Sequence, residues 1–191
     1  FAALNELYCY DNQLTSLDVS NNTALTHLFC EDNQLFSLDV SNNTALIQLF
    51  CNSNNLPSLD LSNNSALTLL QCYENRLTSL DLSNNAALEW FTCHENLLIS
   101  LDVSNNSSLL GFSCNDNQLT CLNVKNGNNT NFIGLYANNN PDLMCIEVDD
   151  VVYSTENWQN DSLLYWQFDA QIYFSTYCFN SCSVGIEELS N

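Results

Sequence analysis

The chain has 191 residues, of which 46% are hydrophobic and 11% aromatic, so it can bury one sizeable core and is not a disordered tail. Its cations are Arg76 and Lys125 alone, against 22 acidic residues, which gives a formal net charge of −20. A surface so acidic repels nucleic acid and anionic lipid, so DNA and RNA binding are excluded. No apolar run approaches the roughly 20 residues of a membrane helix, and the first residues lack the regions of a signal peptide. We therefore expect a mature or trimmed chain without membrane insertion.

The dominant feature of the sequence is a repeat with a period of 21 residues. Residues 3–23 read ALNELYCYDNQLTSLDVSNNT, and residues 24–44 read ALTHLFCEDNQLFSLDVSNNT. A sixth unit, 108–130, is two residues longer, and a degenerate seventh runs from 131 to about 150. A period of about 20 to 50 residues indicates a stacked repeat architecture. The regular units begin at Ala3, Ala24, Ala45, Ala66 and Ala87.

Within a unit, apolar residues alternate at two places, Leu7-x-Cys9 and Leu17-x-Val19 in the first unit, as they do in short strands. Neither stretch can bury its apolar side alone, but stacking the units about 4.7–4.9 Å apart closes a continuous core. A helical interpretation fails because Asn, Ser and Asp, which favour turns, dominate between the apolar residues. The expected inward column contains Leu7, Leu28, Leu49, Leu70, Phe91, Phe112 and Leu135.

An asparagine also recurs in every unit, directly after the Cys-containing stretch. Its amide can satisfy backbone groups of its own coil and of the next one, which a buried bend requires. The expected column contains Asn12, Asn33, Asn54, Asn75, Asn96, Asn117 and Asn140.

The resulting pattern, L-x-x-L-x-C-x-x-N-x-L, resembles the leucine-rich repeat in the short 21-residue form of secreted, internalin-like Bacteroidetes proteins. The resemblance covers about 3–150 and implies a β-rich solenoid of about seven coils with parallel strands on its concave face. Residues 1–150 would form this solenoid, and residues 151–184 resemble the C-terminal capping segment of the same proteins. The tail, 185–191, resembles the linker before a type IX secretion sorting domain, so we expect a longer precursor.

A cap is physically necessary, since the last coil would otherwise expose its apolar columns and an open strand edge. No comparable segment precedes Leu4, so we expect the first coil to be uncapped or cut. The apolar residues available to cover the last coil are Val148, Val151, Val152, Trp158, Trp166 and Phe168.

Six of the ten cysteines share one inward column and are expected to remain reduced. A metal or redox array would use the same column, but no CxxC or His-x-Cys spacing supplies a zinc site. Stacked side chains are parallel, with Cβ atoms about 5 Å apart, outside the roughly 3.5–4.5 Å that disulfides use. Packing as small hydrophobic side chains explains them better. They are Cys9, Cys30, Cys51, Cys72, Cys93 and Cys114.

The other four cysteines lie outside that column. Cys121 and Cys145 take the place of an outward serine on neighbouring coils. Their side chains are therefore also expected to be parallel, which argues against a bond between them. In the family that this segment resembles, the cysteines of the L-x-C-I and F-S-x-x-C motifs occur together, and here these are Cys145 and Cys178. Cys121 and Cys182 depart from that pattern as a matched pair of extras. We therefore hypothesise Cys145–Cys178 and Cys121–Cys182 bonds that join cap to array in an oxidising compartment.

In leucine-rich repeats, the outward residues of the Leu-x-Cys strand line the concave face. Exposed aromatic residues gather there in this chain, and a patch of that kind usually marks a contact site. The alternative is a stacking ladder that only stabilises neighbouring strands. The residues expected to bind a partner are Tyr8, Tyr10, Phe29, Phe50, Tyr73, Trp90 and His94.

The other predicted strand carries one aspartate per coil, and neighbours would repel by about 1 kcal/mol in water. Either turn N–H groups satisfy each carboxylate, or calcium binds between the coils. No D-x-D-x-D-G loop is present, so we expect no cofactor and keep calcium as the alternative. The aspartates are Asp18, Asp39, Asp60, Asp81 and Asp102, and a second acidic column contains Asp11, Asp32, Glu74, Glu95 and Asp116.

No catalytic motif stands out in the sequence, and the two histidines, His27 and His94, fall in different columns about three coils apart, so they share no metal. We therefore expect no enzyme. The sequence favours a secreted or cell-surface recognition or adhesion module that binds a protein through its concave face. Two alternatives remain: a carbohydrate-binding surface protein that stacks sugars on Trp90, Tyr73 and Phe50, and a structural spacer.

Overall fold

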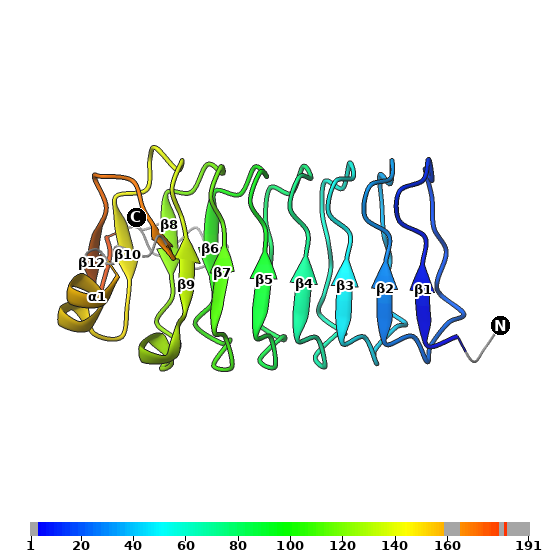
Figure 1. Cartoon of the computed structure of the whole chain (residues 1–191), viewed down its shortest axis with the longest axis horizontal. Coiled ribbons are helices and arrows are strands. Elements are labelled where there is room, and N and C mark those ends of the chain that lie inside the picture. The colour runs from blue at the N-terminus through cyan, green and yellow to red at the C-terminus, as the bar shows by residue number, and fades with distance from the viewer. Residues whose placement is uncertain (1–3, 159–164, 180–181, 183–191) are drawn as a thin grey trace, which may run out of the picture.

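The computed structural model describes residues 4–158, 165–179 and 182, so the expected linker, 185–191, lies outside the described residues. The chain forms an elongated solenoid whose coils stack side by side (Figure 1). Each coil gives one short strand to a long parallel sheet, as the repeat predicts. Its strands are, in spatial order, β1 (Glu6–Tyr8), β2 (His27–Phe29), β3 (Gln48–Phe50), β4 (Leu69–Gln71), β5 (Trp90–Thr92), β7 (Gly111–Ser113), β9 (Gly134–Tyr136) and β11 (Trp166–Gln167).

The second predicted strand forms only near the C-terminal end. Four parallel strands make up this short sheet: β6 (Ser100–Asp102), β8 (Cys121–Asn123), β10 (Cys145–Glu147) and β12 (Tyr173–Ser175). In the earlier coils the alternation holds, since Val19 is buried, but the backbone is not paired as a strand. Thus the predicted strand at Leu17–Val19 is wrong. Residues 79–81 and 100–102 are both Ser-Leu-Asp, so the neighbouring coil, and not residue type, decides the pairing.

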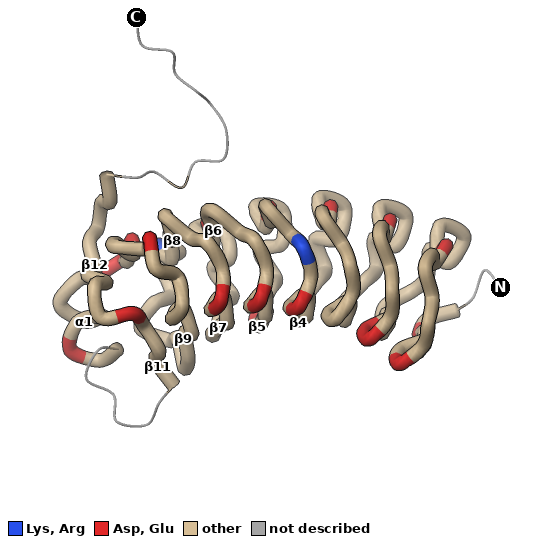
Figure 2. The backbone as a smooth tube through the Cα atoms, turned by 90° about the horizontal axis from the view of Figure 1, so that it is seen from above, with Lys and Arg blue, Asp and Glu red and all other residues tan. Residues whose placement is uncertain are grey.

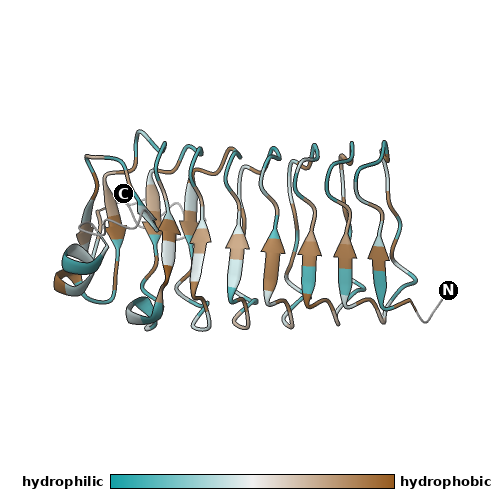
Figure 3. Ribbon diagram, in the orientation of Figure 1, coloured by the Kyte–Doolittle hydropathy of each residue, from teal (hydrophilic) through white to brown (hydrophobic). Residues whose placement is uncertain are grey.

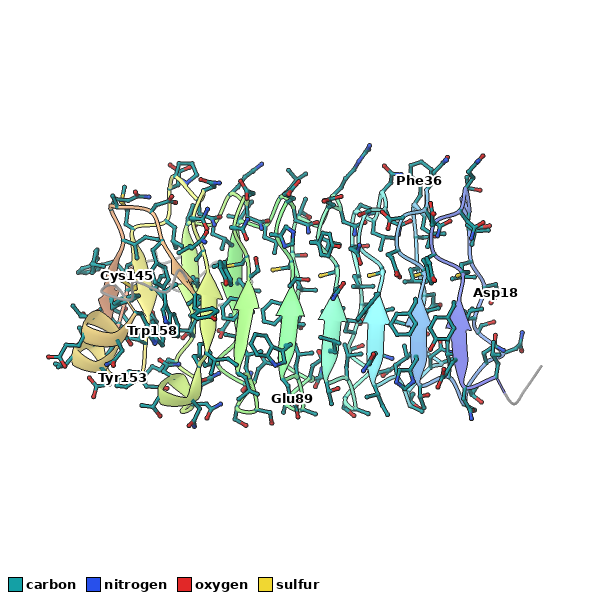
Figure 4. The ribbon with its side chains drawn as sticks, viewed as in Figure 1. Asp18, Phe36, Glu89, Cys145, Tyr153 and Trp158 are labelled. Carbon is teal, nitrogen blue, oxygen red and sulfur yellow. A yellow bond between two sulfur atoms is a disulfide. The ribbon has the colours of Figure 1, made fainter. Side chains whose placement is uncertain are left out.

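The core follows the predicted inward column. Its leucine and phenylalanine side chains are buried from the second coil onward, whereas Leu7 in the first coil is half-buried. The rings of Phe91 and Phe112 stack with centroids 4.7 Å apart. Sulfur atoms run along the interior in Figure 4. The thiols of Cys30, Cys51, Cys72, Cys93 and Cys114 are free and buried, and that of Cys9 in the first coil is free and half-buried.

The asparagine column joins each coil to the one before it. The Asn96 Nδ2 donates to the carbonyl oxygens of Cys72 (3.0 Å) and Cys93 (3.1 Å), and its Oδ1 accepts from the Leu77 N–H (2.9 Å). A second buried ladder, which the sequence analysis missed, lies in the Ser-Asn-Asn bends. There the Asn64 Nδ2 donates to the carbonyl oxygen of Val40 at 3.1 Å. The corresponding residues are Asn43, Asn64, Asn85 and Asn106.

The cap covers the last coil with a helix, two strands and an aromatic cluster. Helix α1 (Val151–Asn157) begins at Asp150, whose side chain accepts the N–H groups of Val152 and Tyr153, and a short 3-10 turn, η1 (Asn129–Asn131), precedes β9. Trp158, labelled in Figure 4, is buried beside α1, and its ring stacks on Phe132 and Trp166. Within the described part of the chain, no helix is long and apolar enough to cross a membrane.

The prediction for the cap holds with one exception. Trp158 and Val148 are buried, and Val151, Trp166 and Phe168 are half-buried against the core. Val152, however, is 64% exposed. The reason is the helix, which was not predicted: successive helical residues point to different sides, so Val151 and Val152 cannot both face the last coil.

Candidate binding surface

The outward side chains of the long sheet form three columns, as the sequence predicted. Strand pairing places Tyr8 beside Phe29 and Phe29 beside Phe50, in register. The solenoid bends gently with this sheet on the inside of the curve (Figure 2). We call these columns the inner face: Glu6, His27, Gln48, Leu69, Trp90 and Gly111; Tyr8, Phe29, Phe50, Gln71, Thr92 and Ser113; and, just after each strand, Tyr10, Glu31, Asn52, Tyr73, His94 and Asn115.

Three aromatic rings of the inner face contact one another on β1, β2 and β3. Tyr8 stacks on Phe29 with ring centroids 4.9 Å apart, and Phe29 meets Phe50 edge-on at 4.6 Å. Tyr8 and the nearby Tyr10 remain 58% and 51% exposed. In Figure 3 these strands begin hydrophilic and become hydrophobic beyond their first residue. The rings therefore form a continuous apolar strip with a polar border on one side.

Trp90 provides a second apolar area at the middle of the face. Its indole lies against Gly111 of the next coil, where an added Cβ would come within 2.8 Å of the ring and 2.6 Å of the Gly134 carbonyl oxygen. Glycine at this position therefore lets the ring lie close to the backbone while it stays 36% exposed. Trp90 was predicted from the sequence, whereas the role of Gly111 was not.

Tyr73 and His94 form a stacked pair in the third column, with ring centroids 4.4 Å apart and planes 9° apart. Burial, followed by the charge of Glu74, raises the pKa of Tyr73. Beside this pair, buried acceptor atoms lack a hydrogen-bond donor among the described residues, namely the Glu31 Oε2 and the Asn52 Oδ1. Burial also raises the pKa of Glu31. His27 is apart from His94, in another column, as expected.

The first acidic column is fully used by the fold. Each of its aspartates accepts, through Oδ1, the backbone N–H of the serine two residues later; the Asp60 to Ser62 distance is 2.9 Å. Hydrogen bonds from Ser20, Ser41 and Ser62 lower the pKa of Asp18, Asp39 and Asp60. No group of three His, Cys, Asp or Glu side chains among the described residues is arranged to hold a metal ion. We call this the back column: Asp18, Asp39, Asp60, Asp81 and Asp102.

The second acidic column, which we call the acidic rim, lies at the edge of the inner face. Figure 2 shows acidic residues at intervals along the side of the array where β4, β5 and β7 lie. The Glu74 carboxylate accepts from the Ser53 hydroxyl (2.9 Å), and the Asp116 carboxylate accepts from Asn139 Nδ2 (2.8 Å). All rim residues have positive φ, between 49° and 54°. They are Asp11, Asp32, Glu74, Glu95 and Asp116.

The four cysteines outside the column are bonded in the two hypothesised pairs, each joining the array to the cap. Cys121 is joined to Cys182, with Cα atoms 5.4 Å apart, and Cys145 to Cys178, with Cα atoms 5.9 Å apart. Cys121 and Cys145 lie on the adjacent strands β8 and β10, and the cap covers both of them. These bonds hold the cap at the end of the short sheet.

No protein-family model and no curated protein matches this sequence. Among solved structures, the functional domain of InlJ from Listeria monocytogenes, described as including a cysteine ladder, is 33% identical, with a TM-score of 0.72. The match covers 87% of this chain and 39% of that one. This chain has its own column of six free cysteines in the same kind of array. The fold is that of an internalin-like leucine-rich repeat solenoid.

Two further structures share the fold at lower identity. The internalin InlF of L. monocytogenes is 19% identical with a TM-score of 0.57, and the match covers 91% of this chain and 63% of that one. A leucine-rich repeat protein of Leptospira interrogans is 20% identical with a TM-score of 0.67, and the match covers 87% and 48%. The chain thus spans less than two thirds of each. The internalin-like fold is a non-enzymatic scaffold, typically a protein-binding module.

Proposed function

We propose that this chain is a recognition module that binds a protein partner through its inner face. The observation that carries the proposal is the set of aromatic side chains left uncovered on the inside of the curve. Tyr8, Tyr10 and Trp90 are among the exposed large apolar residues, and Phe29, Phe50, Tyr73 and His94 are half-buried beside them. Aromatic residues of this kind dominate the energetics of protein interfaces.

The rigidity of the scaffold supports the same function. Every coil is tied to its neighbours by strand pairing and by asparagine side chains, so the inner-face residues are ordered before a partner arrives. A preordered surface loses less conformational entropy on binding than a flexible one. The module would therefore bind without rearrangement of its backbone.

We further propose that the module works in a secreted or cell-surface protein. Two disulfides join the cap to the array, and such bonds persist in oxidising compartments. We expect export by type IX secretion, because the sequence resembles internalin-like Bacteroidetes proteins in which such a tail precedes a sorting domain.

Carbohydrate binding is the second candidate function, and Trp90 is the observation that favours it. An indole that lies against Gly111 and remains 36% exposed could stack against a sugar ring, near the polar residues Gln71 and Thr92. A glycan array separates the two functions: saturable sugar binding that is lost in Trp90→Ala would favour the sugar.

The protein-binding function can be tested by a pull-down in which the chain is immobilised and exposed to proteins from the extracellular medium in which its source organism lives. We expect Tyr8→Ser combined with Trp90→Ser to lose a specifically captured protein. Phe36→Ser is the matched control, because Phe36 is 59% exposed but lies outside the inner face. Capture that survives the inner-face substitutions, or is lost equally with Phe36→Ser, would contradict the proposal and favour a structural spacer.

A further inference from the structure

We propose that the inner face is built for a cationic protein partner, one whose contact surface presents a row of Lys or Arg side chains to the acidic rim. This inference rests on the proposed function and adds the chemistry of the partner. It follows from a comparison of the two acidic columns, from the unpartnered acceptors of the inner face, and from the position of the aromatic rings.

The carboxylates of the acidic rim are mostly not used by the fold itself. In the back column, every aspartate accepts a backbone N–H in its own turn. In the rim, the carboxylates of Asp11, Asp32 and Glu95 have no hydrogen-bond or ion-pair partner in the part of the chain that the structure describes. Replacing them would therefore remove no intramolecular bond, so their role lies outside the fold.

Two of the rim residues, the glutamates, also occupy a backbone conformation that does not favour them. Glu74 and Glu95 have φ values of 49° and 52°, in the left-handed region where glycine and asparagine are the most comfortable residues. Asn139 shows that asparagine fits the same position in the seventh coil. Neighbouring carboxylates about one coil apart repel each other as well. Negative charge is thus present at this edge at a cost to the folded chain.

Two acceptor atoms of the inner face next to the rim also lack a hydrogen-bond partner in the described part of the chain. The Asn52 side chain is 2% exposed and its Oδ1 has no donor among the described residues. Glu31 is half-buried, and its Oε2 also has no donor there. Both atoms are acceptors and both lie in the third column, directly before the rim in sequence. Because both atoms are buried, they add negative potential at this edge and do not themselves touch a partner. The exposed carboxylates of Asp11, Asp32 and Glu95 are the acceptors that a guanidinium or ammonium group, which supplies donors only, can reach.

The aromatic rings complete the complementarity. The residue immediately before each rim acid belongs to the third column, and in two of the five coils it is a tyrosine, Tyr10 before Asp11 and Tyr73 before Glu74. At the other three positions it is Glu31, His94 or Asn115. Cations bind over the faces of aromatic rings, and with a carboxylate nearby the two attractions act on the same group. The five rim acids span six coils, with Ser53 in the third, so at about 4.8 Å per coil the rim matches an extended cationic segment of roughly seven residues.

The experiment compares two variants that change the net charge by the same amount. The rim variant is Asp11→Asn, Asp32→Asn, Glu74→Gln, Glu95→Gln and Asp116→Asn, and the back variant is Asp→Asn at all five back-column positions. Each raises the formal charge from −20 to −15. The probe is fluorescein-labelled deca-arginine, with deca-glutamate as the negative control, and binding is measured by fluorescence anisotropy at low salt.

We expect the rim variant to bind deca-arginine about tenfold more weakly than the unchanged chain, and the back variant to change binding by less than about twofold. Equal weakening in both variants would mean that only net charge matters, and no weakening would mean that the rim is not the site; either overturns the inference. Circular dichroism confirms that each variant folds. If the rim variant fails to fold, Asp32→Asn with Glu95→Gln replaces it.

The same variants separate this inference from the proposed function. If a natural partner is lost with the aromatic substitutions but is retained by the rim variant, a protein is bound at the inner face and the cationic partner is wrong. If the aromatic substitutions change nothing, the proposed function fails first.

Discussion

The array and the cap use cysteine in opposite ways. In the array, six cysteines form one column and all are free, five of them fully buried. At the junction with the cap, two cysteines of the last coils bond to two of the cap, across sequence separations of 33 and 61 residues. Stacked coils give parallel side chains that pack but do not pair, whereas the returning cap segment brings cysteines from opposite directions. The array is thus stabilised by repetition, and the cap by crosslinks between unlike segments.

The largest expected effect is alkaline loss of stability in the array. Burial raises the pKa of the Cys51, Cys72 and Cys93 thiols well above the ordinary 9.0, so the folded chain keeps these protons. Above pH 9 the unfolded chain loses them, and the free energy of unfolding falls by about 1.4 kcal/mol per pH unit for each such thiol. Below pH 9 both states keep the proton and the thiols add no pH dependence.

Urea unfolding at pH 7.5, 9 and 10 measures this slope. The matched control is Cys51→Ala with Cys72→Ala, which should unfold with a slope above pH 9 that is shallower by about 2.8 kcal/mol per pH unit. The disulfides of the cap do not titrate, so they contribute nothing to the difference. Parallel slopes for the two proteins would show that the buried thiols do not set the alkaline limit.

A somewhat smaller effect is expected from one asparagine of the array. Asn96→Ala removes the hydrogen bonds to the Leu77 N–H and to the Cys72 and Cys93 carbonyl oxygens, all in buried surroundings. Because these buried backbone groups would be left without a hydrogen-bond partner, the free energy of unfolding should fall by about 3–5 kcal/mol. Asn12→Ala is the control, since Asn12 is exposed in the first coil and donates only within its own turn. If denaturant unfolding shows that Asn96→Ala and Asn12→Ala lose the same free energy of unfolding, the hydrogen bonds between coils do not stabilise the array.

The smallest of the three effects is expected in the cap. Cys145→Ser with Cys178→Ser opens one crosslink and should cost about 2–4 kcal/mol, through the entropy gained by the unfolded chain. Hydrogen exchange should show faster opening of α1 and β12 and unchanged protection of β2 to β5, because each coil contacts only its neighbours. Equally faster exchange along the whole array would mean that cap and array unfold as one unit.

The parts of the molecule that repeat were predictable from the sequence, since the same residues recur at a fixed period. The inward leucines, the Asn96 column and the register of Tyr8, Phe29 and Phe50 follow directly from the 21-residue unit. The division of the cysteines also followed, because position in the unit decides which way a side chain points.

The parts that depend on neighbours were not predictable in the same way. Ser-Leu-Asp pairs as a strand at 100–102 but not at 79–81, which no local pattern can distinguish. The helix at Val151–Asn157 is short and occurs once, and its one signal was Asp150 as an N-cap. The support that Gly111 gives to Trp90 acts between coils, so it emerged only when the coils were placed side by side.

The asparagine ladders have a consequence for the history of the gene. Each asparagine of the column bonds only to its own coil and to the coil before it, with the same donors and acceptors at Asn54, Asn75 and Asn96. Recombination that duplicates or deletes one 21-residue unit would leave every asparagine of the column with its partners and would leave the cap unchanged. Unequal crossing-over can thus lengthen or shorten the solenoid one coil at a time, because each added coil folds with the same contacts as its neighbours.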